Sequence, residues 1–169
     1  DVEVPLPAEE RYFVESIKDK SPKKRLYAIE KYVQENSYYD FENGEVMEEK
    51  KDLSFIERLS FMQIRCKELA QKNRDLKKSG KRFAGVCADF ALLTTALMQR
   101  SGLIAGVATG AVPRMGRATI ADAHAVSISL WPDKSGNKIV AIDGTPKVGL
   151  NAEETEMLQE IRLQTLAER

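Results

Sequence analysis

The sequence predicts an α+β fold in which N-terminal helices and one central helix pack on a small antiparallel β-sheet. Apolar residues recur at helical spacing through the first half of the chain. The segment from Cys87 to Arg100 is apolar on most sides, as expected of a buried central helix. After Gly102 the pattern changes to short strand-like segments. Helices followed by adjacent strands are typical of α+β proteins.

Two helix starts in the first half have clear signals. Ser21 is an N-cap candidate followed by proline, and Ser54 with Glu57 forms a capping box. We therefore expect helices over residues 9–17, 22–36 and 54–78, the last ended by Gly80, with a loop over residues 38–52. The third helix should bury a stripe that contains Ile56, Leu59, Met62 and Cys66.

The second half predicts three strands and a closing helix. Strands are expected over residues 104–112, 123–131 and 138–143, with a hairpin turn at 132–137. Asn151 and Glu154 should cap a last helix whose apolar face contains Met157, Leu158 and Ile161.

The composition limits the classes of function. The 169 residues suit a single domain, and 26 basic residues balance 26 acidic ones, so no charge excess favours nucleic acid or an anionic membrane surface. The longest weakly polar stretch, residues 103–112, is too short to cross a bilayer. No signal peptide is recognised, and two cysteines make no disulfide framework, so the sequence assigns neither compartment nor oligomeric state.

The chain begins at Asp1 without a methionine. We therefore expect the single domain over residues 1–169 to be either excised from a longer protein or present as a processed chain. Its parts would be a helical part over residues 1–80, a catalytic core over 81–146 and a C-terminal helix over 147–169.

Three residues could form a site for an activated thiol. Cys87 is expected at the start of the central helix, where unpaired N–H groups and the helix dipole favour a thiolate and can stabilise an oxyanion. His124, the one histidine of the chain, begins a strand, and Asp143 ends the next one. A nucleophile, a base and a group that orients the base are what thiol catalysis requires.

The hairpin register decides whether the histidine and the aspartate can meet. A two-residue loop at Lys134 and Ser135 would place His124 and Asp143 on one face of the sheet, one diagonal step apart. Such diagonal neighbours lie about 7–8 Å apart at Cα. A slip of one residue would place them on opposite faces. Asp143 is therefore either a cap of the following turn or a partner of His124.

The remaining candidates favour structural roles. Cys66 lies on an apolar helical stripe, as a buried small residue would, and Asp89 in the first turn of the central helix suits capping or packing. Arg114 and Arg117 belong to a loop that is more typical of a solvated segment than of a substrate contact. One histidine and two separated cysteines disfavour a zinc site, and Gly106 and Gly110 lack the context of a nucleotide fingerprint.

The sequence around these residues resembles the transglutaminase-like domain superfamily, which has a papain-like core. Residues 85–91, Gly-Val-Cys-Ala-Asp-Phe-Ala, are similar to the motif around the nucleophile of that family, His124-Ala125 to its His-Ala pair, and Asp143-Gly144-Thr145 to its Asp-x-Thr. The spacings, 37 residues from cysteine to histidine and 19 from histidine to aspartate, are also similar. The resemblance is firm over residues 83–146 and weaker over 21–39. The chain departs from the family at Val126, where an aromatic residue is frequent, and in the elaborated segment 45–81.

The resemblance implies a thiol-dependent enzyme with Cys87 as nucleophile, His124 as general base and acid, and Asp143 as the orienting residue. Its substrates would be amide or peptide carbonyls of a protein or peptide, and the acyl-enzyme would be resolved by hydrolysis or by transamidation. This chemistry needs no metal or organic cofactor. A non-catalytic binding or scaffolding domain of the same fold remains the alternative, since fold does not fix function. An unrelated α+β domain in which the three residues occur by chance is a third interpretation.

Overall fold

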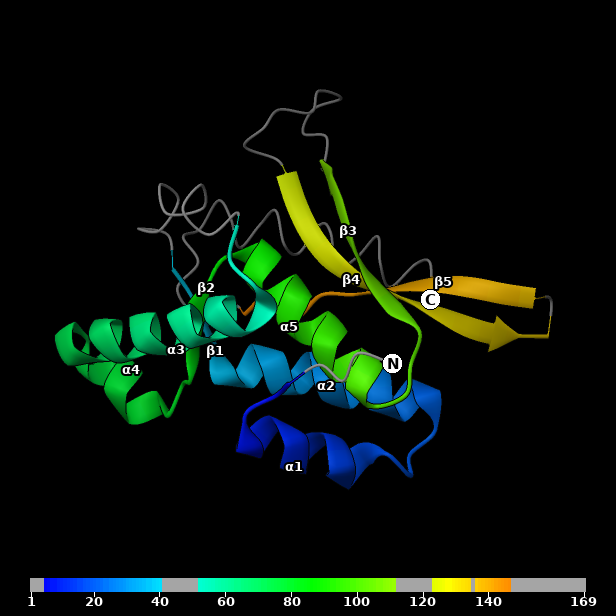
Figure 1. Ribbon diagram of the computed structural model, residues 1–169, viewed down its shortest axis with the longest axis horizontal. Coiled ribbons are helices and arrows are strands. Elements are labelled where there is room, and N and C mark those ends of the chain that lie inside the picture. The colour runs from blue at the N-terminus through cyan, green and yellow to red at the C-terminus, as the bar shows by residue number, and fades with distance from the viewer. Residues whose placement is uncertain (1–4, 41–51, 112–122, 135, 147–169) are drawn as a thin grey trace.

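The computed structural model describes residues 5–40, 52–111, 123–134 and 136–146, and over these it has the predicted α+β architecture (Figure 1). The elements in chain order are α1 Ala8–Ile17, α2 Pro22–Asn36, β1 Ser37–Tyr39, α3 Phe55–Lys72, α4 Arg74–Ser79, β2 Phe83–Gly85, α5 Cys87–Arg100, β3 Ala105–Ala111, β4 Ala123–Asp133 and β5 Gly136–Ile142. The expected C-terminal helix and the arginines Arg114 and Arg117 lie outside the described residues. No helix in the described part is both long and apolar enough to span a bilayer.

Helix α5 is the centre of the molecule. Its buried side chains include Phe90, Leu93, Leu97 and Met98. It packs against β4 on one side and against α2 on another, and Figure 1 shows it in the middle of the fold. An almost wholly apolar helix is thereby covered on both sides, which explains why its sequence shows little amphipathic character.

The main sheet has the strand order β3-β4-β5, and both pairs of strands are antiparallel, as predicted. Asp133 pairs with Gly136, so two residues connect β4 to β5. At the other end of the ladder Ser127 pairs with Ile142. This register is the one that the two-residue loop predicts.

A second, two-stranded sheet was not expected. Strands β1 and β2 pair in parallel, with Tyr38 opposite Ala84, so the loop predicted from residue 38 onward is wrong at Tyr38 and Tyr39. Each strand has only three residues, which is too short for a recognisable alternation of apolar and polar side chains. The pairing places the end of α2 beside the segment that leads into α5.

The helix predicted over residues 54–78 is broken at Asn73. The Ser54–Glu57 capping box opens α3 as expected, but the Asn73 side chain accepts hydrogen bonds from the N–H groups of Asp75 and Leu76 and so caps a separate helix, α4. Gly80, with φ 69°, ends α4. The predicted buried stripe holds for Leu59, Met62 and Cys66, whereas Ile56 in the first turn is 52% exposed, so its predicted burial is wrong.

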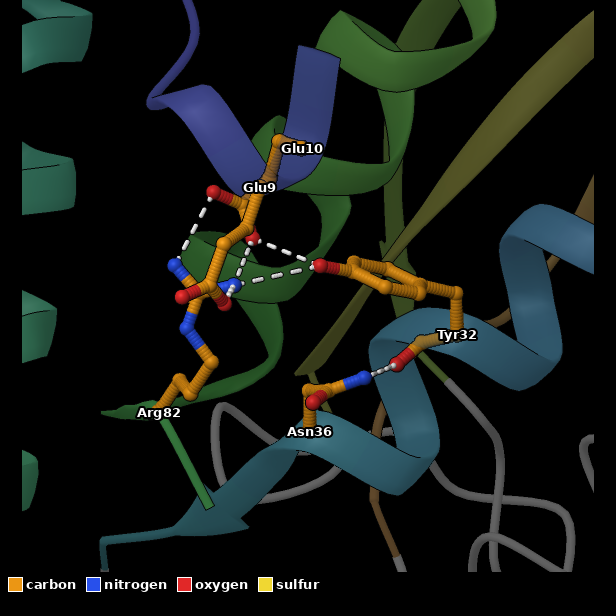
Figure 2. A network of polar contacts seen from close by, with 5 residues as sticks. All are labelled: Glu9, Glu10, Tyr32, Asn36 and Arg82. Atoms are coloured by element: carbon orange, nitrogen blue, oxygen red, sulfur yellow. Dashed lines mark hydrogen bonds and ion pairs between the residues drawn. The ribbon is translucent and has the colours of Figure 1, made fainter. Parts of the chain in front are cut away.

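A charged network joins α1, α2 and the residue that precedes β2 (Figure 2). Glu10 is fully buried, and its carboxylate accepts hydrogen bonds from Arg82, at 2.6 and 3.1 Å, and from the Tyr32 hydroxyl at 2.7 Å. Burial and the hydrogen bond to Glu10 raise the pKa of Tyr32, so its hydroxyl stays protonated and donates. Arg82 also pairs with Glu9. The buried carboxylate is therefore neutralised by one arginine, as a buried charge must be.

Candidate active site

Cys87 is the first residue of α5, as the sequence predicts. Its side chain is partly exposed, whereas Cys66 is buried within α3. The N–H groups in the first turn of a helix have no intrahelical acceptor, so the sulfur lies beside donors that the helix itself does not use and beside the positive end of the helix dipole. Cys87 is therefore the thiol that a substrate could reach.

Asp89 fixes the backbone that precedes the cysteine. Its fully buried carboxylate accepts the Val86 N–H at 3.0 Å and forms an ion pair with Arg58 of α3 at 3.2 Å. A Cβ added at Gly85 would lie 2.6 Å from Asp89 Oδ2, so only glycine fits there without displacement. The capping role predicted for Asp89 is confirmed.

The structure brings Cys87, His124 and Asp143 together. His124 Nε2 lies 3.2 Å from Asp143 Oδ2, and a second side-chain partner of His124 is Cys87. Because Nε2 faces the carboxylate, Nδ1 is the ring nitrogen left for the thiol. The three residues thus form one series of contacts across α5, β4 and the segment that follows β5.

The electrostatics of the series favour a charged imidazole. Burial lowers the pKa of His124, but the hydrogen bonds and charges of Asp143 and Cys87 outweigh it and raise the pKa to about 9. Burial also raises the pKa of Asp143, and here the hydrogen bond and charge of His124, with the hydrogen bonds from Thr145, lower it overall. At neutral pH Asp143 is an anion and His124 an imidazolium, in which both ring nitrogens donate.

A polar contact holds β4 against α5 close to the site. The Ser127 hydroxyl donates to the carbonyl oxygen of Ala91 at 2.8 Å and accepts from the Thr95 hydroxyl at 3.0 Å. Ser127 is three residues from His124, and Ala91 is one helical turn from Cys87. These bonds fix the histidine strand relative to the cysteine helix.

Asp143 both caps its turn and faces the histidine. Its Oδ1 accepts the Thr145 N–H at 2.9 Å, while Oδ2 faces His124. The two roles that the sequence left as alternatives are therefore performed by the two oxygens of one carboxylate. The side chain is only 1% exposed, so its orientation is tightly defined.

The sequence did not reveal two residues that hold the main chain of Asp143. Gln34 Nε2 donates to the Asp143 carbonyl oxygen at 2.7 Å, and Glu30 Oε1 accepts the Asp143 N–H at 3.3 Å. Both lie on α2, four residues apart and hence on one helix face. Only their contact with a segment more than 100 residues away distinguishes them from ordinary polar positions of an amphipathic helix.

Gly144 lies directly beside this site, and we predict that Gly144→Ala destabilises the protein. A Cβ at this position would overlap Thr94 Oγ1 and come within 3.0 Å of Val33 Cγ1. Overpacking of a buried position costs about 1–3 kcal/mol, which urea denaturation would measure. Gly106→Ala in β3 is the matched control, because a Cβ there meets no atom within 4 Å. Equal stabilities of the two variants would contradict the prediction.

No group of three or more histidine, cysteine, aspartate or glutamate side chains within the described segments could hold a metal ion. The groups that the site offers for chemistry are the thiol of Cys87, the imidazole of His124 and the carboxylate of Asp143.

A cysteine at the start of a central helix, packed on an antiparallel sheet that carries the histidine and leads to the aspartate, is the arrangement of papain-like domains. A family model described as transglutaminase-like domain matches residues 10–128, a segment that contains Cys87 and His124, while Asp143 lies beyond it. The chain belongs to the transglutaminase-like domain family. Searches of curated proteins and of solved structures gave no match.

Proposed function

We propose that the chain is a thiol-dependent acyl-transfer enzyme that acts on amide or peptide carbonyls of a protein or peptide. The observation that carries this proposal is the placement of Cys87, His124 and Asp143 side by side, with His124 Nε2 3.2 Å from Asp143 Oδ2. The raised pKa of His124 supports a charged imidazole beside the thiol. An imidazolium next to a cysteine stabilises the thiolate, which is the nucleophilic form.

The proposed reaction has two steps. The Cys87 thiolate attacks the carbonyl carbon, and a first-turn N–H of α5 donates to the developing oxyanion. The C–N bond then breaks as the His124 imidazolium gives its proton to the leaving amine, and a thioester remains on Cys87. In the second step water or an acceptor amine gives a proton to His124 and attacks the thioester. The C–S bond breaks, the product is the acid or the new amide, and the Cys87 thiolate and the His124 imidazolium are restored.

Alkylation by iodoacetamide at pH 7, followed by mass spectrometry, tests the activated thiol. We expect rapid single modification of the wild type at Cys87, and none at this rate in Cys87→Ser. Cys66→Ser should react as the wild type does, because Cys66 is buried and burial raises its pKa. Equal labelling of the wild type and Cys87→Ser would contradict the proposal and favour a non-catalytic binding or scaffolding domain.

A second experiment tests acyl transfer itself. Glutamine-containing peptides, with and without a fluorescent primary amine, distinguish transamidation from hydrolysis. Product formation that disappears in Cys87→Ser and persists in Cys66→Ser would support the proposal. Persistent activity in Cys87→Ser would assign the reaction to another group.

A further inference from the structure

The segment that carries Asp143 has left the β-sheet. The last pair of the β4–β5 ladder is Ser127 with Ile142, so the backbone groups of Asp143 have no partner in that ladder. Two side chains of α2 take the place of a strand, since Gln34 donates to the Asp143 carbonyl and Glu30 accepts its N–H.

The same face of α2 also closes the space behind the aspartate. Gly144 packs against Val33 of α2 and Thr94 of α5 so closely that no Cβ fits, and Val33 and Thr94 are fully buried. Helix α2 itself carries none of the three site residues. The position of the carboxylate therefore depends on a helix that lies more than 100 residues earlier in the sequence.

We propose that Gln34 is a positioning residue, which holds the main chain of Asp143 so that its carboxylate stays aligned with His124 Nε2. Glu30 completes the arrangement from the other side of the same residue. The role rests on the proposed function in one respect, namely that Asp143 orients the base.

The proposal follows from how a carboxylate acts on an imidazole. A contact at 3.2 Å stabilises the imidazolium only while the oxygen remains in place, and the attraction weakens as the separation grows. Residues that orient a ligand or base in this way are commonly hydrogen-bonded themselves. Among the described residues, the ionisable groups that face His124 are Asp143 and Cys87, and α2 adds Glu30 at the Asp143 N–H.

The single histidine makes the test direct, because one set of imidazole NMR signals reports its pKa. The titration is done in Cys87→Ser, so that the contact with Asp143 is the one that the measurement follows. We expect Gln34→Met, which keeps the side-chain volume and removes the donor, to lower the pKa of His124 by about 1 unit, the lower end of the effect of a contacting opposite charge.

Gln99→Met is the matched control. Gln99 makes the same kind of bond, from Nε2 to the Ala105 carbonyl at 2.9 Å, but at the end of α5 opposite Cys87. The substitution Gln99→Met should leave the pKa of His124 unchanged. If Gln34→Met does not fold, Gln34→Asn, whose shorter side chain brings the amide out of reach, replaces it.

Equal pKa values for His124 in the Gln34 and Gln99 variants would overturn the proposal, because a purely structural glutamine would change stability and leave the titration alone. The titration uses a protein without the nucleophile, so its result does not depend on acyl transfer. A lower pKa of His124 in Gln34→Met, together with an unreactive Cys87 in the wild type, would support the positioning role and reject the proposed function. A reactive Cys87 in the wild type, together with an unchanged pKa of His124 in Gln34→Met, would support the proposed function and reject the positioning role.

Discussion

Replacement of His124 by glutamine is expected to lower the rate of acyl transfer by about 10³-fold, within the range that a positioned acid–base group contributes. Glutamine can still accept or donate one hydrogen bond to Asp143, but it carries no positive charge beside the thiol and cannot protonate the leaving amine. The rate of product formation from a peptide substrate, compared at equal protein concentration, measures the loss. A variant with more than a tenth of the wild-type rate would show that His124 is not the acid.

The same substitution should also remove a pH dependence of stability. The pKa of His124 is raised in the folded protein to about 9 from an ordinary 6.5, so the stabilisation is fully present below pH 6.5 and is lost as the pH rises toward 9. Cys87→Ser is again the background, so that Asp143 is the one remaining charged contact of His124 among those that raise its pKa. The contribution of Asp143 to the raised pKa of His124 remains in Cys87→Ser, so its free energy of unfolding should fall as the pH rises above 6.5. The fall should be absent from the double variant Cys87→Ser, His124→Gln. The same pH dependence of the free energy of unfolding in the two variants would contradict a raised pKa of His124.

Arg82→Met is expected to destabilise the protein by about 3–5 kcal/mol, the cost of leaving a buried charge without its partner. Glu10 is fully buried, and Arg82 supplies the positive charge that pairs with it, through hydrogen bonds at 2.6 and 3.1 Å (Figure 2). Urea denaturation of the variant and the wild type gives the difference in the free energy of unfolding.

Two further variants distinguish the cost of an unpaired buried carboxylate from the loss of an ordinary ion pair. Lys31→Met breaks the exposed contact with Glu35, at 3.7 Å, and should change stability by less than about 0.5 kcal/mol. Glu10→Gln combined with Arg82→Met removes the buried charge and keeps an acceptor for the Tyr32 hydroxyl, so it should be more stable than Arg82→Met alone. A double variant of equal or lower stability would show that the unpaired carboxylate is not the cause.

Features with a strong local signal were predictable from the sequence. The Ser21–Pro22 and Ser54–Glu57 starts depend on neighbouring residues, and the structure has both. A hairpin turn was also expected over residues 132–137, and the structure shortens it to a two-residue connection, a register that the sequence left open. The register of that hairpin then places His124 and Asp143 within reach of each other. That these residues act with Cys87 in catalysis stays a prediction.

Features that depend on distant partners were not predictable. The parallel pairing of β1 with β2 joins segments 46 residues apart, and neither three-residue strand has a pattern of its own. Asn73 resembles any polar helical residue until its side chain is seen to cap α4. Gln34 is indistinguishable from a solvated position until the far end of the chain packs against α2.

The bonds from α2 to Asp143 also bear on the order in which the chain acquires its reactive form. Gln34 and Asp143 are 109 residues apart, so closing this loop costs entropy that only the assembled core repays. During synthesis from the N-terminus, Cys87 precedes His124 by 37 residues and Asp143 by more. Under the proposed function, Cys87 therefore has no acid–base partner while the intervening chain is being made, and the three site residues come together only in the folded domain.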